Sequence, residues 1–131
     1  MLGTLVDRFG GELRGVSARE TDVRGVCLDS RKVAENDLYV AIPGLSTDGV
    51  RFVEDAVGRG ARAVLAPRDS ELLESQIGSN ETPVWLHPEA RGMAGRVAAE
   101  LYGKPSEKLF VVAVTGTNGK TTTALLIREI L

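Results

Sequence analysis

One stretch of the sequence determines how the first part of the chain folds: Leu38-Tyr39-Val40-Ala41-Ile42, followed directly by Pro43-Gly44. Five consecutive apolar residues that stop at a Pro-Gly pair are typical of a β-strand buried on both faces. A second predicted strand, at residues 23–28, precedes it and ends at the polar trio Asp29-Ser30-Arg31. The sequence therefore predicts two buried strands that end in polar loops, at residues 29–31 and 44–49.

Helical and strand patterns alternate on both sides of this pair. The helices have apolar residues three or four apart, and the strands are short apolar runs between glycine, proline or polar residues. Such alternation predicts an α/β domain, which we place at residues 1–88. The predicted helices are residues 2–9, 52–57, 69–77 and 88–101, the further strands are residues 61–66 and 84–86, and residues 78–83 form a loop.

A phosphate-binding pattern lies near the C-terminal end of the sequence: Val111-Val112-Ala113-Val114-Thr115-Gly116-Thr117-Asn118-Gly119-Lys120-Thr121-Thr122-Thr123. The order of apolar run, glycine turn, lysine and hydroxyl residues predicts a buried β-strand, a loop and the start of a helix. Backbone N–H groups of such a loop, together with the helix N-terminus, attract an anion. Lys120 would contact the β- and γ-phosphates of a nucleoside triphosphate, and the Thr121 hydroxyl would ligate Mg²⁺. The residues that we assign to ATP are Gly116, Thr117, Asn118, Gly119, Lys120, Thr121 and Thr122.

This loop departs from the general phosphate-loop pattern at one position, because Val114 stands where that pattern has a glycine. The alternative interpretation is an ordinary strand-to-helix turn that contains two glycines and a lysine. The combination of features favours a nucleoside triphosphate, but it does not identify a reaction.

Composition limits the classes of function that need to be considered. The chain has 131 residues, of which 43% are hydrophobic, and a formal net charge of −2. The basic residues are scattered, which gives no electrostatic case for nucleic acid. The first residues contain no long apolar stretch, so we expect no signal peptide, no membrane span and a cytoplasmic location. Cys27 is the only cysteine, which excludes a disulfide framework, and Trp85 and His87 are expected to pack half-exposed beside a strand end.

Several motifs, taken in their order along the chain, resemble the Mur ligase family. The N-terminal motifs of that family are matched by Asp29-Ser30-Arg31-Lys32-Val33, by residues 37–44 and by Asp48-Gly49. Leu101-Tyr102-Gly103-Lys104-Pro105-Ser106, followed by the phosphate loop, resembles the MurE branch in particular. The MurF branch shares the N-terminal motifs but usually has a different phosphate loop, and the folate polyglutamate ligases lack the N-terminal domain.

The resemblance implies a domain organisation and a second set of binding residues. It implies a UDP-binding N-terminal domain at residues 1–88, a linker helix and hinge at 89–107, and the truncated start of the ATP-binding domain at 108–131. For Asp29 and Arg31 we favour an ion pair or loop cap over ligand contact, and for Asp48-Gly49 we favour turn chemistry. The residues that the resemblance assigns to the UDP-substrate are Leu28, Ser30, Leu45, Ser46 and Thr47.

The implied activity of the full-length protein is ATP-dependent amide formation in peptidoglycan synthesis. A MurE-type ligase adds the third amino acid, meso-diaminopimelate or L-lysine, to UDP-N-acetylmuramoyl-L-alanyl-D-glutamate through an acyl phosphate, with ATP and Mg²⁺. No catalytic residue of the family falls within these 131 residues, so we expect the fragment to be inactive. We also expect residues 109–131 to mediate a non-native self-association of the chain. The alternatives are a MurF-type D-alanyl-D-alanine-adding ligase and a non-catalytic module that binds a nucleotide or UDP-sugar.

Overall fold

The computed structural model describes residues 1–44, 47–70 and 82–131. Its centre is a five-stranded sheet with the strand order β1-β5-β4-β3-β2. Strands β2 to β5 run parallel, and β1 pairs with β5 in the antiparallel sense. The predicted α/β class is therefore confirmed. The strands are β1 (Glu12–Arg14), β2 (Gly25–Cys27), β3 (Asp37–Val40), β4 (Ala63–Ala66) and β5 (Val84–Leu86).

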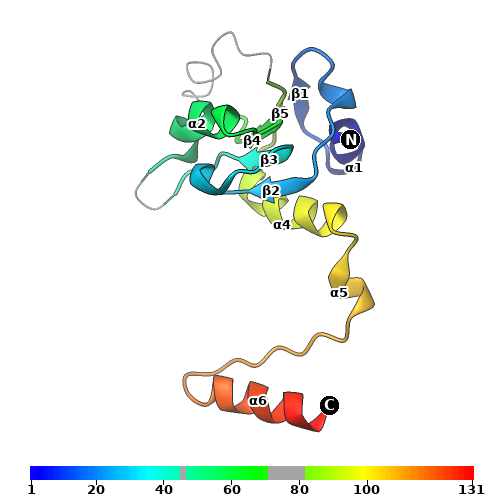
Figure 1. Ribbon diagram of the computed structural model, residues 1–131, viewed down its shortest axis with the longest axis vertical. Coiled ribbons are helices and arrows are strands. Elements are labelled where there is room, and N and C mark those ends of the chain that lie inside the picture. The colour runs from blue at the N-terminus through cyan, green and yellow to red at the C-terminus, as the bar shows by residue number, and fades with distance from the viewer. Residues whose placement is uncertain (45–46, 71–81) are drawn as a thin grey trace.

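Helices cover both faces of the sheet, which gives three layers (Figure 1). Helices α1 and α4 pack on one face, and α2 packs on the other. Three short 3-10 helices connect these elements, and two further helices follow α4. The helices are α1 (Leu2–Phe9), η1 (Ala18–Glu20), η2 (Ser30–Lys32), η3 (Gly49–Phe52), α2 (Val53–Gly58), α4 (Ala90–Leu101), α5 (Pro105–Lys108) and α6 (Lys120–Ile130).

The central strands are almost entirely apolar because both of their faces are covered; the exception in β3 is its first residue, Asp37. In β3, Leu38 and Val40 belong to the core cluster under α1 and α4, whereas Tyr39 belongs to the cluster under α2. Neighbouring side chains of a strand point to opposite faces, so a strand buried on both sides has no polar alternation. Met93 and Val97, four residues apart and so on the same side of α4, are fully buried over the first of these faces.

Two features of the N-terminal region differ from the prediction. Strand β1 was not expected, since two of its three residues are charged and it lies half-exposed at the edge of the sheet. Trp85 and His87 are buried rather than half-exposed. The Trp85 indole Nε1 donates to the Gly10 carbonyl at 2.8 Å, and His87 Nε2 lies 3.2 Å from the Phe9 carbonyl. Both rings therefore satisfy carbonyl groups at the C-terminal end of α1.

The apolar segment before the phosphate loop does not form the buried strand that was predicted for it. Residues 109–114 are extended but form no strand, and Phe110 is 90% and Val111 67% exposed. A parallel strand is buried only when it has neighbours and covering helices, and the sheet described above provides no edge beside this segment. Figure 1 shows residues 109–131 leading away from the sheet. Of the predicted helix at 69–77 and the loop at 78–83, residues 71–81 lie outside the described residues.

Candidate functional site

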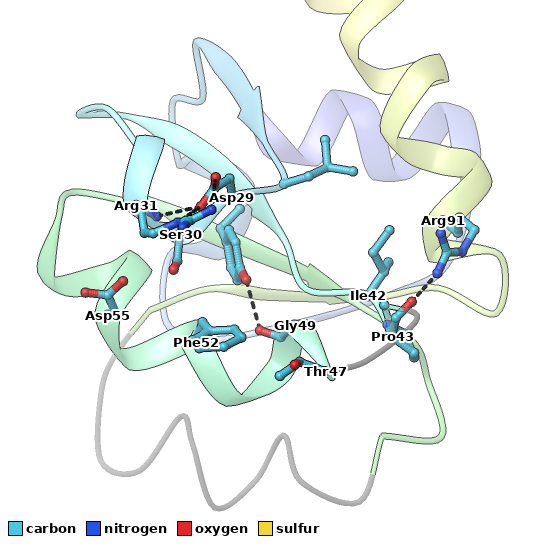
Figure 2. A pocket seen from close by; sticks show the side chains of 13 residues that line it. Asp29, Ser30, Arg31, Ile42, Pro43, Thr47, Gly49, Phe52, Asp55 and Arg91 are labelled. Carbon is cyan, nitrogen blue, oxygen red and sulfur yellow. Dashed lines mark hydrogen bonds and ion pairs between the residues drawn. The ribbon is translucent and has the colours of Figure 1, made fainter.

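A pocket of about 540 Å³ lies at the carboxyl ends of strands β2 and β3 (Figure 2). Ligands of open parallel sheets bind at this edge, because the loops after the strands meet there. Most of the lining residues come from the loops after the neighbouring strands β2 and β3, and helices α2 and α4 contribute one residue each. The residues that line the pocket are Leu28, Asp29, Ser30, Arg31, Tyr39, Ile42, Pro43, Gly44, Thr47, Gly49, Phe52, Asp55 and Arg91.

The loop after β2 is shaped by Asp29 and Arg31. The Asp29 carboxylate accepts from the Arg31 backbone N–H at 3.1 Å and so caps the 3-10 helix η2. The Arg31 side chain returns two further hydrogen bonds to the same carboxylate, at 2.8 and 2.9 Å. The Arg31 hydrogen bond lowers the pKa of Asp29 to about 2. The expected ion pair and loop cap are therefore present, and they hold Ser30 between them.

The loop after β3 is shaped by Asp48 and Gly49. The Asp48 carboxylate accepts from the Val50 N–H at 3.0 Å and caps η3, which confirms the predicted turn chemistry. A Cβ at position 49 would lie 2.7 Å from the Ile42 carbonyl oxygen, too close for any side chain. Only glycine lets the returning chain approach the end of β3 this closely.

Ser30 lies at the bottom of the pocket beside Asp55 of α2. The Ser30 side chain is only 6% exposed. The Ser30 hydroxyl, acting as a hydrogen-bond donor, is the main cause that lowers the pKa of Asp55 below its usual value, and Arg59 adds to the effect. Arg59 also forms an ion pair with Asp55 at 3.0 Å. This end of the pocket therefore presents an ionised carboxylate and a hydroxyl.

Tyr39 forms the wall between the two loops. Its hydroxyl donates to the Gly49 carbonyl at 2.9 Å, so the bond joins β3 to the loop that closes the pocket (Figure 2). Burial raises the pKa of Tyr39 to about 12, and the nearby Cys27 and three carboxylates act in the same direction. The phenol is therefore neutral at physiological pH, and its buried ring supports the pocket wall from behind.

The structure brings together three of the five residues assigned to the UDP-substrate. Leu28, Ser30 and Thr47 all line the pocket, although they come from two different loops. Leu45 and Ser46 lie outside the described residues. Besides the residues at the end of β3, sequence reasoning missed four lining residues. Tyr39 and Phe52 read as core residues, and Asp55 and Arg91 lie on helices for which no site was predicted. These four are Tyr39, Phe52, Asp55 and Arg91.

The phosphate loop and helix α6 form the predicted loop-to-helix arrangement. Gly119 has φ 78°, a left-handed conformation that glycine adopts without strain, and α6 begins at the next residue. The Lys120 ammonium folds over the loop and donates to the carbonyls of Gly116 at 2.6 Å and Thr117 at 3.3 Å. No side chain caps the N-terminus of α6. Its first N–H groups are therefore open to an anion.

Two negative findings hold for the part of the chain that the structure describes. No group of three or more His, Cys, Asp or Glu side chains is placed to hold a metal ion. None of the described helices is both long and apolar enough to cross a lipid bilayer.

Known proteins share this fold and parts of this sequence. The crystal structure of a MurF ligase from Thermotoga maritima in complex with ADP is 31% identical, with a TM-score of 0.54. The match covers 77% of this chain and 21% of that one.

Two curated relatives carry the name UDP-N-acetylmuramoyl-L-alanyl-D-glutamate--2,6-diaminopimelate ligase. The one from Syntrophomonas wolfei is 41% identical and matches 86% of this chain and 22% of its own length. The one from Caldanaerobacter subterraneus is 37% identical and matches 97% of this chain and 25% of its own length. The chain thus spans about a fifth to a quarter of the length of these relatives.

A family match covers the pocket and the sheet around it. The Mur ligase family, catalytic domain, matches residues 22–97, which is more than half of the chain. These residues include strands β2 to β5 and all of the residues that line the pocket. The chain belongs to the Mur ligase family.

Proposed function

We propose that this chain is the N-terminal part of a MurE-type ligase, which acts in the cytoplasm in peptidoglycan precursor synthesis. The full protein adds the third amino acid to UDP-N-acetylmuramoyl-L-alanyl-D-glutamate in an ATP-dependent reaction. The observation that carries this proposal is the identity of 41% and 37% with relatives named as 2,6-diaminopimelate-adding ligases of that substrate. Of meso-diaminopimelate and L-lysine, these names favour the first as the added amino acid.

The pocket between the loops after β2 and β3 supports a role in holding the UDP end of the substrate. Phe52 offers exposed aromatic surface and Leu28 an exposed apolar side chain, with the buried ring of Tyr39 behind them in the pocket wall. A pyrimidine base needs such surface, together with hydroxyl or carboxylate groups at its polar edge, which Ser30 and Asp55 supply. We propose Leu28, Ser30 and Thr47, with Leu45 and Ser46 of the same loop, as the UDP-substrate residues.

The phosphate loop supports a role in holding ATP with Mg²⁺. The uncapped N-terminus of α6, the glycine turn before it and the Lys120 ammonium together fit a triphosphate. We propose that Lys120 neutralises phosphate charge and that the Thr121 hydroxyl ligates Mg²⁺. The further residues that would contact ATP are Gly116, Thr117, Asn118, Gly119 and Thr122.

The chemistry that ATP supplies is activation of the substrate carboxylate as an acyl phosphate, from which the incoming amine then displaces phosphate. Within residues 1–131 the phosphate loop would orient the triphosphate, and the pocket would anchor the nucleotide end of the substrate. We assign no general base or amine-binding residue to this chain. We therefore propose that residues 1–131 by themselves bind nucleotides but do not form the amide bond.

Two measurements test the proposal. Titration of residues 1–131 with UDP, followed by NMR, should show shifts at Ser30 and Thr47, and Lys120→Ala should leave the UDP affinity unchanged. The full reading frame should release phosphate only when ATP, the UDP-dipeptide and the amino acid are all present. Phosphate release from ATP that depends on D-alanyl-D-alanine and a UDP-tripeptide would instead identify a MurF-type ligase. Absence of ligation by the full reading frame, together with UDP binding, would favour a non-catalytic binding module.

A further inference from the structure

The two ends of the pocket differ in how their charges are paired. The carboxylates at one end are paired with arginines, whereas the arginine at the other end has no carboxylate partner among the described residues. Ser30 and Asp55 lie together at one end, next to the ion pair of Asp29 with Arg31, whereas Arg91 lies at the other end beside Pro43 (Figure 2). Asp29 and Asp55 both have pKa values below the ordinary range, so both are ionised at pH 7. A ligand with one anionic and one neutral end would therefore enter in a single orientation.

Arg91 differs in its partners from the other arginine of the pocket. Arg31 is held by two side-chain hydrogen bonds to the Asp29 carboxylate. Arg91 donates instead to the Pro43 carbonyl, an uncharged acceptor. Among the described residues, no carboxylate forms an ion pair with Arg91. The Arg91 guanidinium therefore keeps its full positive charge, and most of its five N–H donors, for a further partner.

We propose that Arg91 binds the diphosphate of the nucleotide and thereby fixes its orientation, with the base at the Ser30 and Asp55 end. This inference rests on the proposed function, because it assumes that the pocket holds a uridine nucleotide. A guanidinium binds phosphate oxygens through parallel hydrogen bonds, and it does so more strongly when no carboxylate competes. The contact with Pro43 holds the side chain at the rim, where it can reach the diphosphate without losing its backbone partner.

The opposite orientation is unfavourable for an electrostatic reason. A diphosphate at the Ser30 end would lie next to the Asp55 carboxylate. One arginine, Arg59, is paired with that carboxylate, so no further positive charge of this pair is left for a phosphate. Like charges a few ångströms apart repel, and the pocket walls give less screening than bulk water. The base, which carries no charge, avoids this repulsion.

The test compares uridine with UDP on residues 1–131, because the two ligands differ only in the diphosphate. We expect unmodified protein to bind UDP at least tenfold more tightly than uridine, as measured by NMR titration at low salt. Arg91→Gln should remove most of this difference and leave the uridine affinity unchanged. Arg91→Lys keeps the charge but not the paired hydrogen bonds, so it should lose about threefold in UDP affinity. Arg96→Gln, on the same helix but stacked on Phe9, is the matched control and should change neither affinity.

The possible results separate this inference from the proposed function. Equal affinities for uridine and UDP in the unmodified protein would overturn the role of Arg91 without any variant. An Arg91→Gln protein that loses both affinities equally would assign Arg91 to loop structure alone and would also overturn it. If Arg91→Gln does not fold, Arg91→Lys decides, since unchanged UDP affinity there contradicts the paired contact. Absence of binding by both uridine and UDP would contradict the proposed UDP site itself.

Discussion

The Tyr39 hydroxyl donates a 2.9 Å hydrogen bond to the Gly49 carbonyl, and this bond joins the central strand β3 to the loop that closes the pocket. Tyr39 is almost completely buried, whereas Gly49 is half-buried and lines the pocket. The shape of the pocket therefore depends on a contact between one core side chain and one backbone group.

Replacement of Tyr39 by Phe removes this hydrogen bond and keeps the aromatic ring. We expect the free energy of unfolding to fall by about 1 kcal/mol, since the Gly49 carbonyl is left without its donor. Urea unfolding followed by Trp85 fluorescence measures the change. Tyr102→Phe, on an exposed side chain, is the control and should have no effect. Equal stability of Tyr39→Phe and the unmodified protein would show that water replaces the donor.

The ionisation of Tyr39 gives a second prediction at high pH. Its pKa is raised to about 12, so between about pH 10 and 12 the folded chain keeps a proton that the unfolded chain releases. Stability is therefore fully present below about pH 10 and is lost as pH rises through this window. A Tyr102→Phe protein leaves Tyr39 as the only tyrosine, so its absorbance at 295 nm should titrate near pH 12. A midpoint near 10 would contradict the burial of the phenol.

Arg31→Gln tests the ion pair that shapes the loop after β2. The Arg31 hydrogen bond is the largest cause that lowers the pKa of Asp29 to about 2, so the variant should raise this pKa toward the usual value near 4. Because the folded pKa is depressed, the stabilisation is present above about pH 4 and is lost as pH falls toward 2. Carboxyl ¹³C chemical shifts measured against pH report the midpoint directly. An unchanged Asp29 midpoint in the variant would mean that backbone N–H groups alone hold the carboxylate.

Ser30→Ala tests the role of the hydroxyl in ligand binding. If Ser30 makes one hydrogen bond to the nucleotide, UDP binding should weaken by about 0.5–1.5 kcal/mol. The variant also removes the main cause that lowers the pKa of Asp55, so this pKa should rise. Calorimetric titration with UDP and an NMR titration of Asp55 measure the two effects separately. A shifted Asp55 pKa with unchanged UDP affinity would restrict Ser30 to a structural role.

Much of the fold could be predicted from the sequence because the decisive signals are local. The apolar run at residues 38–42 and the Pro-Gly stop depend only on neighbouring residues, and so do the caps made by Asp29 and Asp48. The motifs grouped Leu28, Ser30 and Thr47 in one expected site, and all three line the pocket. The contribution of Arg91 could not be predicted in this way, since it reaches the pocket only because α4 packs across the sheet to the loop after β3.

The errors have a shared physical cause, which is that burial depends on elements distant in the sequence. Residues 109–114 have the pattern of a buried strand, yet burial requires neighbouring strands that this sheet does not provide. Trp85 and His87 were expected to be half-exposed, and they are buried because α1, about 75 residues earlier, ends against them. A periodicity argument cannot detect either relationship.

Truncation tests how far the first folding unit extends, for which residue 88 is the expected boundary. Helix α4 begins just after that point, and its Met93 and Val97 are fully buried against the sheet. Burial of two such side chains stabilises a fold by roughly 3–6 kcal/mol, a large share of the stability of a small domain. We therefore propose that residues 1–104 fold independently, whereas residues 1–88 expose the core face beneath α4 and do not.

Comparison of residues 1–104 with residues 1–131 tests the exposed C-terminal segment. Residues 109–131 carry apolar side chains, including Phe110 and Ile130, that contact little else in the described structure. Unpaired apolar segments of this kind promote association, so residues 1–131 should self-associate and residues 1–104 should sediment as a monomer. Circular dichroism and urea unfolding of residues 1–104 should show the same sheet stability as the longer chain. A strictly monomeric protein of residues 1–131 would contradict the association. Cooperative unfolding of residues 1–88 would instead place the boundary of the first folding unit at residue 88.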